Sequence, residues 1–343
     1  MLMINQTSVP AELMVTEGEN GMRAGVVVAK ATFLIGSGSI ELDTEGPLPV
    51  LTEDVPTELG VLPQDTLVPG PRAPFEVAVL AAAYPSGELG EEMTVHLTIA
   101  DRELALGVSG DRFWRETEAG PVASAPAPFT RLPLTWSRTF GGRADVWVDP
   151  HTCVWVEDPL NPEGRGFDAF EAARGLAGSW GAPQGFPRVG EGERALPNLE
   201  RPTDRASSWG ARPEPYCWAP LSISNRLVPR WQSERTLNGQ EGSSLLHSLQ
   251  RCHPDLCFPS APVGASVRLR GCHPDGDLEF RIPALRVGLD YELGARSGYR
   301  DASPQLLIIM ADERRFTMTY RLYFQFPHEP DEVRSVRLVV GEG

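Results

Sequence analysis

The sequence predicts a mainly β protein: an antiparallel β-sandwich or barrel-like framework from both chain ends, around a long irregular middle with one or two short helices. Short β-rich runs separated by turn residues occupy the first and last thirds. Between them Gly and Pro are dense and regular periodicity nearly vanishes. Yet most of the eight tryptophans fall in this middle, and large aromatic residues are what disordered segments lack. They are Trp136, Trp147, Trp155, Trp180, Trp209, Trp218 and Trp231.

The bulk composition fits one composite domain over residues 1–343, with parts at 1–118, 119–242 and 243–343. With 41% hydrophobic and 22% charged residues, the chain has an ordinary globular composition. Its net charge of -15 argues against nucleic acid or an anionic membrane as partner, because both would repel it. A basic protein partner is compatible with this charge.

The amino-terminal residues lack the basic start and apolar run of a secretory signal, and no later window is long enough to span a bilayer. We therefore expect a cytoplasmic protein. The chain has five cysteines, an odd number at irregular spacing, and it is large enough to fold without disulfides. We therefore expect no disulfide framework.

The first predicted strand, residues 25–35, has apolar residues on both faces, as a strand inside a sandwich does. Lys30, the only lysine, lies in its middle. Two interpretations remain open: a buried ammonium paired with a carboxylate, or a side chain that reaches water past its neighbours.

The remaining elements follow from the same reasoning. Residues 36–74, broken by Gly and Pro, are expected to be connections around one or two short strands. Helical spacing at 167–176 and 243–251 predicts two short helices. Further strands are predicted at 75–83, 93–100, 104–108, 266–270, 278–287, 305–310, 316–326 and 333–340.

Three motif segments in the middle of the chain, residues 129–142, 161–167 and 196–200, are called the signature segments here. In the first, Leu132, Leu134, Trp136 and Arg138 would share one face of a short strand, which ends at paired glycines with backbone angles that side chains forbid.

The second and third signature segments each have two readings. Residues 161–166 could form a turn whose backbone N–H groups face an anion or a peptide carboxylate, with Arg165 alongside, or an ordinary loop with an Asx turn. In the third segment, Glu200 could pair with Arg138 or Arg201, or be solvated.

Together with residues 26–33, 108–114 and Tyr320-Arg321, the signature segments resemble the bacterial family catalogued as domain of unknown function 2169, over most of the chain. Members of that family accompany type VI secretion loci and are regarded as adaptors or chaperones for secreted effectors. The resemblance implies a non-catalytic accessory protein, without cofactors, that binds an effector or its spike carrier and assists loading. Where the family has a Gly-rich segment, this chain has Glu214-Pro-Tyr-Cys-Trp-Ala-Pro220.

The residues expected to bind this protein partner lie in the signature segments. The tryptophan-rich middle would supply a shaped recognition surface, because rigid aromatic rings give contact area at low entropic cost. The alternative is that these rings are all core. The candidates are Trp136, Arg138, Phe140, Gly141, Gly142, Asn161, Gly164, Arg165, Gly166, Asn198 and Glu200.

A repeated Cys-His-Pro-Asp tetrapeptide, at Cys252 and at Cys272, raises the question of zinc. Cys252, Cys257, Cys272 and His273 could supply soft or borderline ligands, although their spacing fits none of the common zinc patterns. We expect free thiols and His-Pro-Asp turns, with no bound metal.

Catalytic motifs are weak. Residues 206–210 imitate a nucleophile elbow without the strand and helix it requires, and no phosphate-binding loop is present in the sequence. Glu91, Glu92 and Asp158 are the acids that a hydrolase acting on a cell-wall or glycan substrate would use. Such a hydrolase, or a self-associating structural subunit, is the alternative to the adaptor.

Overall fold

The computed structural model describes residues 2–17, 22–65, 75–147, 151–167, 188–189, 194–222, 251–293, 296–327 and 334–342. Strands dominate these residues, which confirms the mainly β class. Helical structure in the described ranges is limited to two 3-10 turns, η2 (Trp136–Arg138) and η3 (Pro254–Leu256). Apart from one terminal residue each, the helices predicted at 167–176 and 243–251 lie outside the described residues.

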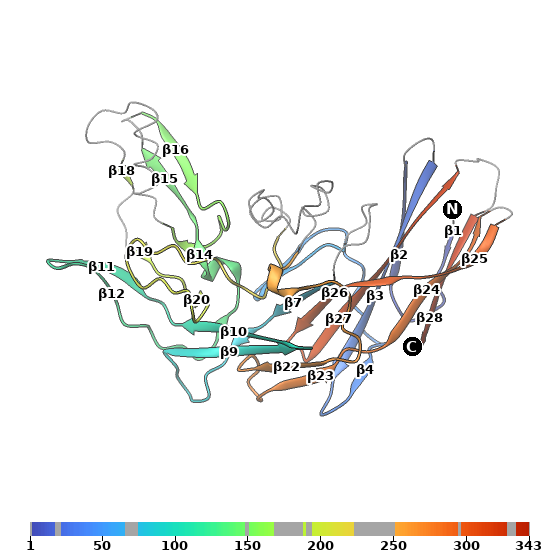
Figure 1. The fold of residues 1–343 in the computed structure, drawn as a ribbon, viewed down its shortest axis with the longest axis horizontal. Coiled ribbons are helices and arrows are strands. Elements are labelled where there is room, and N and C mark those ends of the chain that lie inside the picture. Colours follow the sequence, from blue (N-terminus) through green and yellow to red (C-terminus); the bar gives the residue numbers. More distant parts are fainter. Residues whose placement is uncertain are drawn as a thin grey trace.

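The largest sheet combines strands from both chain ends, as predicted (Figure 1). Its longest pairing joins β3 to β27, from Leu34 opposite Arg315 to Met22 opposite Pro327. One neighbouring pair, β26 with β7, is parallel, so the predicted antiparallel framework also contains a parallel ladder. The order is β2 (Ala11–Glu17), β3 (Met22–Ile35), β27 (Arg315–Pro327), β26 (Ser303–Met310), β7 (Phe75–Leu80) and β21 (Cys257–Phe258), with β4 (Ile40–Leu42) beside β3.

A second sheet draws strands from all three parts of the chain. Its apolar side chains share one continuous core with the large sheet. Phe316 of β27 stacks between Phe33 of β3 and Phe280 of β23, with ring centroids 4.9 and 4.4 Å apart. The order is β20 (Leu199–Glu200), β10 (Arg102–Ser109), β9 (Glu92–Ile99), β22 (Ser266–Arg270) and β23 (Leu278–Arg281).

A third sheet holds the two chain ends together, because β1 pairs in parallel with β28. The strand expected at 278–287 is divided between β23 and this sheet, since Pro283 lies between them and cannot donate a ladder hydrogen bond. The order is β1 (Leu2–Ile4), β28 (Arg334–Glu342), β24 (Leu285–Leu293) and β25 (Arg296–Asp301).

The middle of the chain contains more strand pairing than its weak periodicity predicts. Small sheets lie at one end of the molecule, to the left in Figure 1. They pair β11 (Phe113–Thr117) with β12 (Gly120–Ala123) and β19 (Arg194–Ala195), β14 (Phe140–Gly141) with β17 (Arg165–Gly166), and β15 (Arg143–Trp147) with β16 (Cys153–Glu157) and β18 (Arg188–Val189). Two further short pairs join β13 (Leu132–Pro133) to β8 (Ala82–Ala83) and β5 (Val55–Thr57) to β6 (Gly60–Leu62).

Lys30 is completely buried, and its Nζ atom lies 3.0 Å from the Asp65 carboxylate. The paired interpretation of this lysine is therefore confirmed. Asp65 also accepts hydrogen bonds from the Thr319 hydroxyl (3.0 Å) and the Leu51 amide (2.8 Å). These contacts satisfy a charge pair that would otherwise be costly to bury.

Candidate functional site

The first signature segment begins as predicted and then turns earlier. Leu132 and Leu134 are buried, and Leu132 pairs with Ala83 in a short ladder. From Trp136 to Arg138, however, the chain forms the 3-10 turn η2 and not the expected strand. Arg138 is consequently displaced from the row of buried side chains.

Trp136 is core and not surface. Its indole Nε1 donates a hydrogen bond of 2.8 Å to the Ala219 carbonyl oxygen, and the Cys217 thiol contacts the Leu134 carbonyl oxygen at 3.2 Å. Trp218, which lies between Cys217 and Ala219 in the sequence, is fully buried. The segment 214–220 is thus packed against the first signature segment.

The paired glycines adopt the predicted conformations, with φ of 133° at Gly141 and 122° at Gly142. A Cβ atom on Gly141 would collide with the backbone of Asn161. The Gly142 amide donates to the Asn161 carbonyl oxygen (2.8 Å), and the Asp158 amide donates to the Gly142 carbonyl oxygen (2.8 Å). Only glycine satisfies both the angle and the close approach.

Asn161 fixes this turn from inside. Its buried amide nitrogen donates to the carbonyl oxygens of Trp136 (2.9 Å) and Phe140 (3.1 Å) and to the Thr139 hydroxyl (2.8 Å). Asp158 accepts the Asn161 backbone N–H at 2.9 Å, and burial raises the pKa of the Asp158 carboxyl above its usual value. Asp158 therefore forms an Asx turn over residues 158–161, which ends where the predicted turn at 161–166 begins.

The anion-binding interpretation of residues 161–166 is wrong for the amides of Gly164 and Arg165, and the next amide, that of Phe167, is also bonded within the fold. The N–H groups of Gly164, Arg165 and Phe167 donate to the carbonyl oxygens of Asn161, Thr139 and Gly141, respectively. These donors hold the second signature segment onto the first and do not face outward.

Two signature arginines and Asn198 converge on Asp111. Its Oδ1 atom lies 3.1 Å from Arg165 Nη1, 3.0 Å from Asn198 Nδ2 and 3.8 Å from Arg138 Nη1. Burial, and then the charge of Arg165, lower the pKa of the Arg138 guanidinium. Asn198 is buried, whereas both arginines reach the surface.

Glu200 is buried and paired with Arg112, at 2.8 Å between Oε2 and Nη2. The predicted partners Arg138 and Arg201 are both wrong, because Arg201 instead contacts Asp255 at 2.8 Å. The structure thus brings all three signature segments together into one cluster, which is largely buried. Phe140 and the paired glycines complete its interior.

An exposed hairpin, formed by β15 and β16, follows the first signature segment in the chain. It was not predicted from the sequence. Strands β15 and β16 pair so that one face carries only exposed side chains, which we call the tryptophan face. Val146 on the opposite face is fully buried, so the alternation points the tryptophans outward. The tryptophan face consists of Arg143, Asp145, Trp147, Cys153, Trp155 and Glu157.

Of the tryptophans in the middle of the chain, Trp136 and Trp218 are buried, while Trp147, Trp155 and Trp209 are exposed. The expectation that all are core is therefore wrong; Trp180 and Trp231 lie outside the described residues. A repeated Val-Trp-Val, at residues 146–148 and 154–156, was the signal that could have revealed the hairpin.

The Cys-His-Pro-Asp repeats form turns, as expected. In each, the Asp amide donates to the preceding His Nδ1, at 3.2 Å for Asp255 and His253 and 3.1 Å for Asp275 and His273. Burial raises the pKa of the Cys272 thiol, which makes it a poor nucleophile and ligand. Among the described residues, no three His, Cys, Asp or Glu side chains are grouped as metal ligands would be.

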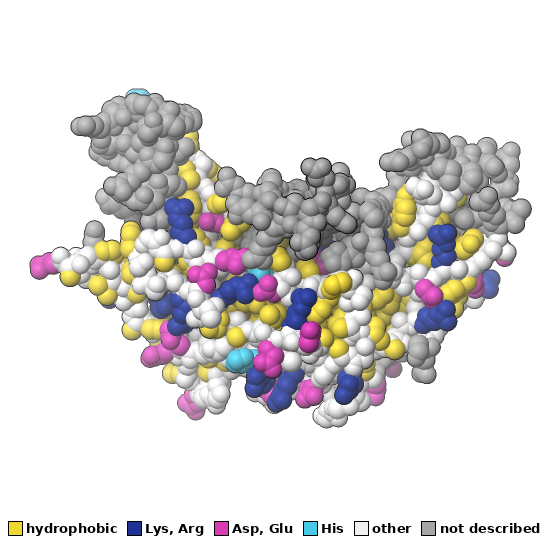
Figure 2. Space-filling view, viewed as in Figure 1, with side chains coloured by type: hydrophobic (Ala, Val, Ile, Leu, Met, Phe, Trp, Pro, Cys, Tyr) yellow, Lys and Arg dark blue, Asp and Glu magenta, His cyan; other side chains and the backbone are white. Residues whose placement is uncertain are grey.

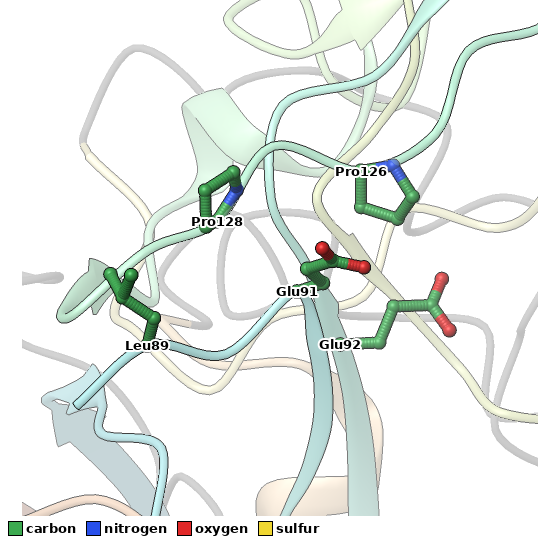
Figure 3. Close-up of a pocket in the computed structure, with 5 residues that line it drawn as sticks. All are labelled: Leu89, Glu91, Glu92, Pro126 and Pro128. Carbon is green, nitrogen blue, oxygen red and sulfur yellow. The ribbon is translucent and has the colours of Figure 1, made fainter. Parts of the chain in front are cut away.

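An open pocket lies beside the start of β9 (Figure 3). Leu89, Glu91 and Glu92 line one side, and Pro126 and Pro128 line the other. Glu92 lies 3.7 Å from Arg205. Asp158, the third acid nominated for hydrolysis, is part of the signature turn and not of this pocket.

Acidic and basic side chains are interspersed over the face shown in Figure 2, with hydrophobic groups between them. The fold and site define a mainly β protein in which a buried turn cluster supports an exposed aromatic hairpin. The chain belongs to the bacterial family described as "Uncharacterized protein conserved in bacteria (DUF2169)", which matches residues 20–321. Comparison with curated proteins and with solved structures gave no match. Within the described ranges, no helix combines the length and hydrophobicity needed to cross a membrane.

Proposed function

We propose that this protein is a non-catalytic adaptor or chaperone of type VI secretion, which binds a secreted effector or its spike carrier and assists loading. Resemblance to the family supports the secretion context. The observation that carries the binding role is the tryptophan face, where the side chains of Trp147 and Trp155 are 44% and 69% exposed. Exposed rigid aromatic groups are typical of the residues that dominate protein interfaces.

The tryptophan face is built on a fixed base. Hairpin β15–β16 starts directly after Gly142 and ends directly before Asp158, and these two residues are joined by a backbone hydrogen bond of 2.8 Å. The signature cluster therefore sets the direction in which the hairpin projects (Figure 1). Under this proposal the buried signature residues position the partner-binding surface, and Arg138 and Arg165 lie at its base.

Charged groups on the same face add selectivity. The Arg143 guanidinium lies over the Trp155 ring, 5.0 Å from its centroid. Asp145 and Trp155 are direct cross-strand neighbours, as are Arg143 and Glu157. A partner that covers these rings must also satisfy two acids and one arginine, so we expect a partner surface with basic groups around an apolar centre.

The test is a pull-down from the native bacterium with the tagged full chain, scored by mass spectrometry. Wild type should recover an effector or spike protein, and Trp147→Ser/Trp155→Ser should lose it while keeping the wild-type circular dichroism spectrum and Tm. Tyr299→Ser, which changes an exposed aromatic side chain on β25, should retain the partner. Equal recovery by all three proteins would remove the tryptophan face from the proposal.

The hydrolase alternative is favoured by one observation, the two adjacent carboxylates at the open pocket. Glu91→Gln and Glu92→Gln would abolish turnover of a glycan or cell-wall substrate if this pocket were catalytic. No turnover by wild type, together with recovery of a protein partner, would exclude this alternative. The third candidate is a self-associating structural subunit. Size-exclusion chromatography with light scattering measures the molar mass in solution, and a mass above that of one chain would favour this candidate.

A further inference from the structure

The outward side of the signature cluster carries more positive than negative charge. Arg138 of η2 and Arg165 of β17 approach the same Oδ1 atom of Asp111, at 3.8 and 3.1 Å. No other carboxylate of the described residues forms an ion pair with either arginine. Two guanidinium groups therefore share one carboxylate, on a chain whose net charge is -15. We call these three residues the arginine site.

The interior of the signature cluster holds the side chains of the arginine site in place. Nη1 of Arg138 donates to Oδ1 of Asn198 at 3.1 Å, and Nδ2 of Asn198 donates to Oδ1 of Asp111 at 3.0 Å. Asn198 is completely buried. Nε of Arg165 donates to the Ser137 carbonyl oxygen at 3.2 Å. A group that binds here meets side chains whose conformations are already fixed, which lowers the entropic cost of binding.

The two guanidinium groups are close enough to repel each other. Burial, and then the charge of Arg165, lower the pKa of Arg138, while the charge of Asp111 opposes this shift. A second anion beside the arginines would relieve the repulsion, because a nearby opposite charge favours the charged form of each group. The amides of Gly164 and Arg165 are bonded within the fold, so side chains must bind such an anion.

Three donor atoms of the arginine site are available to an outside group. Nε and Nη2 of Arg138, and Nη2 of Arg165, have no acceptor within the described part of the chain. Both side chains are 28% exposed, and the three atoms are not among the unpaired polar atoms that the fold closes off from solvent. Nε of Arg112, the residue after Asp111, is closed off in this way. An anion can therefore reach Arg138 and Arg165.

The shape of these donors and the charge balance both favour a carboxylate. Nε and Nη2 of Arg138 lie on one edge of the planar guanidinium, which matches two oxygen atoms of one anion. Nε and Nη2 of Arg286 bind both Asp301 oxygen atoms in this way, at 2.8 and 3.2 Å. Two arginines and one aspartate leave one positive charge, which a carboxylate balances. The Asp111 carboxylate would repel the second charge of a phosphate dianion.

We propose that the arginine site binds a carboxylate of a protein partner, with its two oxygen atoms on the Nε–Nη2 edge of Arg138 and with Arg165 as the second positive charge. The source of this carboxylate rests on the proposed adaptor role: it is an Asp or Glu side chain, or the carboxyl terminus, of the bound protein. The arginine site would complement the tryptophan face, because it accepts an acidic group where that face accepts apolar and basic groups.

The test follows the Nε–H signals of the full chain, labelled in its arginines, by NMR during titration at pH 7 and constant ionic strength. The probes are N-acetylaspartyl amide, which offers a side-chain carboxylate, N-acetylglycylglycine, which offers a terminal one, and the neutral N-acetylasparaginyl amide. The Arg138 signal is identified by its loss in Arg138→Lys. This signal should shift in a saturating way with one or both acids and not with the neutral amide. The acid that binds more tightly identifies the source of the carboxylate.

Two variants should change the affinity in opposite directions. Arg165→Gln removes the second positive charge and should weaken the binding of the acids about threefold or more. Asp111→Asn removes the competing carboxylate and should strengthen their binding by a similar factor. Arg286→Gln, at an exposed arginine that Asp301 satisfies, should bind as the wild type does. A purely structural role of Arg165 and Asp111 would not produce these opposite effects.

A signal shift that stays linear with probe concentration, or that the neutral amide produces equally, would overturn the proposal. Saturable binding of inorganic phosphate without binding of either acid would also overturn it. The pull-down separates this proposal from the adaptor role. If the acids bind but no protein partner is recovered, the carboxylate site stands and the adaptor role fails. If a partner is recovered but neither acid binds, only the arginine site fails.

Discussion

Gly141 shows how a single missing Cβ atom holds two segments together. Its φ of 133° is unfavourable for any side chain, and the space that a Cβ would occupy is filled by the backbone of Asn161. Two penalties, one conformational and one steric, therefore act at the same residue. Gly120 carries only the first, since its φ is 109° and nothing lies within 4 Å of its Cβ position.

We therefore expect Gly141→Ala to destabilise the protein by about 2 kcal/mol more than Gly120→Ala, which should itself cost about 1–3 kcal/mol. Urea unfolding followed by tryptophan fluorescence measures both. Equal losses would show that Asn161 moves away without cost and that the close approach is not a constraint.

Lys30→Met should destabilise the protein by about 3–5 kcal/mol, because it leaves the buried Asp65 carboxylate without its counterion. Lys30→Met/Asp65→Leu removes both charges and should recover part of that loss. The same urea titration serves as the measurement. An unchanged Tm in Lys30→Met would contradict the paired arrangement.

At the scale of single residues, the sequence left open whether Lys30 pairs with a carboxylate or reaches water, and it did not indicate which carboxylate would pair with it. Asp65 belongs to a connection with no periodicity, so only the folded path of that connection brings it to the strand. The turns of the signature segments could be predicted because paired glycines and an Asn-Pro sequence restrict the backbone locally. Their burial was missed because partner choice, such as Arg112 for Glu200, depends on strands distant in sequence.

Among the elements, long strands were predicted best. The predicted strands 25–35 and 316–326 lie within β3 and β27, and the predicted 266–270 agrees with β22. Hairpin β15–β16 was missed because its outward face carries tryptophans, so its alternation does not separate polar from apolar residues. Strand β25, Arg296–Asp301, is mostly polar and is exposed from Ser297 to Asp301, so it gives no hydrophobic signal.

The turn η3 predicts a pH dependence. His253 is buried, and its Nδ1 atom accepts a hydrogen bond from the Asp255 amide, so Nδ1 carries no proton. Arg201, Glu214 and Tyr216 face its ring. Burial lowers the pKa of His253 in the folded state. The unfolded chain therefore binds a proton first, and stability is full above about pH 6.5 and falls as the pH drops from there to the folded-state pKa.

The contribution of His253 is isolated with His253→Asn, whose side-chain oxygen can accept the Asp255 amide without titrating. Between pH 6.5 and 5, the wild type should lose up to about 1.4 kcal/mol of unfolding free energy per pH unit more than the variant. Denaturant unfolding at several pH values supplies the comparison. Parallel pH profiles for the two proteins would show that His253 does not control this turn.

For the whole molecule, the shared core predicts one cooperative unit. Strands β3 and β27 contribute to one sheet, and β20, β9 and β22 bring the three parts of the chain into another. We expect far-UV circular dichroism and tryptophan fluorescence to report coincident unfolding transitions. A chain truncated after residue 250 should lose cooperative unfolding, whereas replacing 144–156 by a two-residue turn should preserve it. Cooperative unfolding of the truncated chain would indicate separable domains.

The pairing of β3 with β27 also constrains how the protein is made. Residue 30 leaves the ribosome long before Thr319, its partner in the sheet, has been synthesised. Until then both edges of the forming sheet are available to other chains, and contacts this distant in sequence form slowly. The nascent protein is therefore expected to need protection from aggregation during most of its translation, and its yield should depend on the cellular supply of general folding factors.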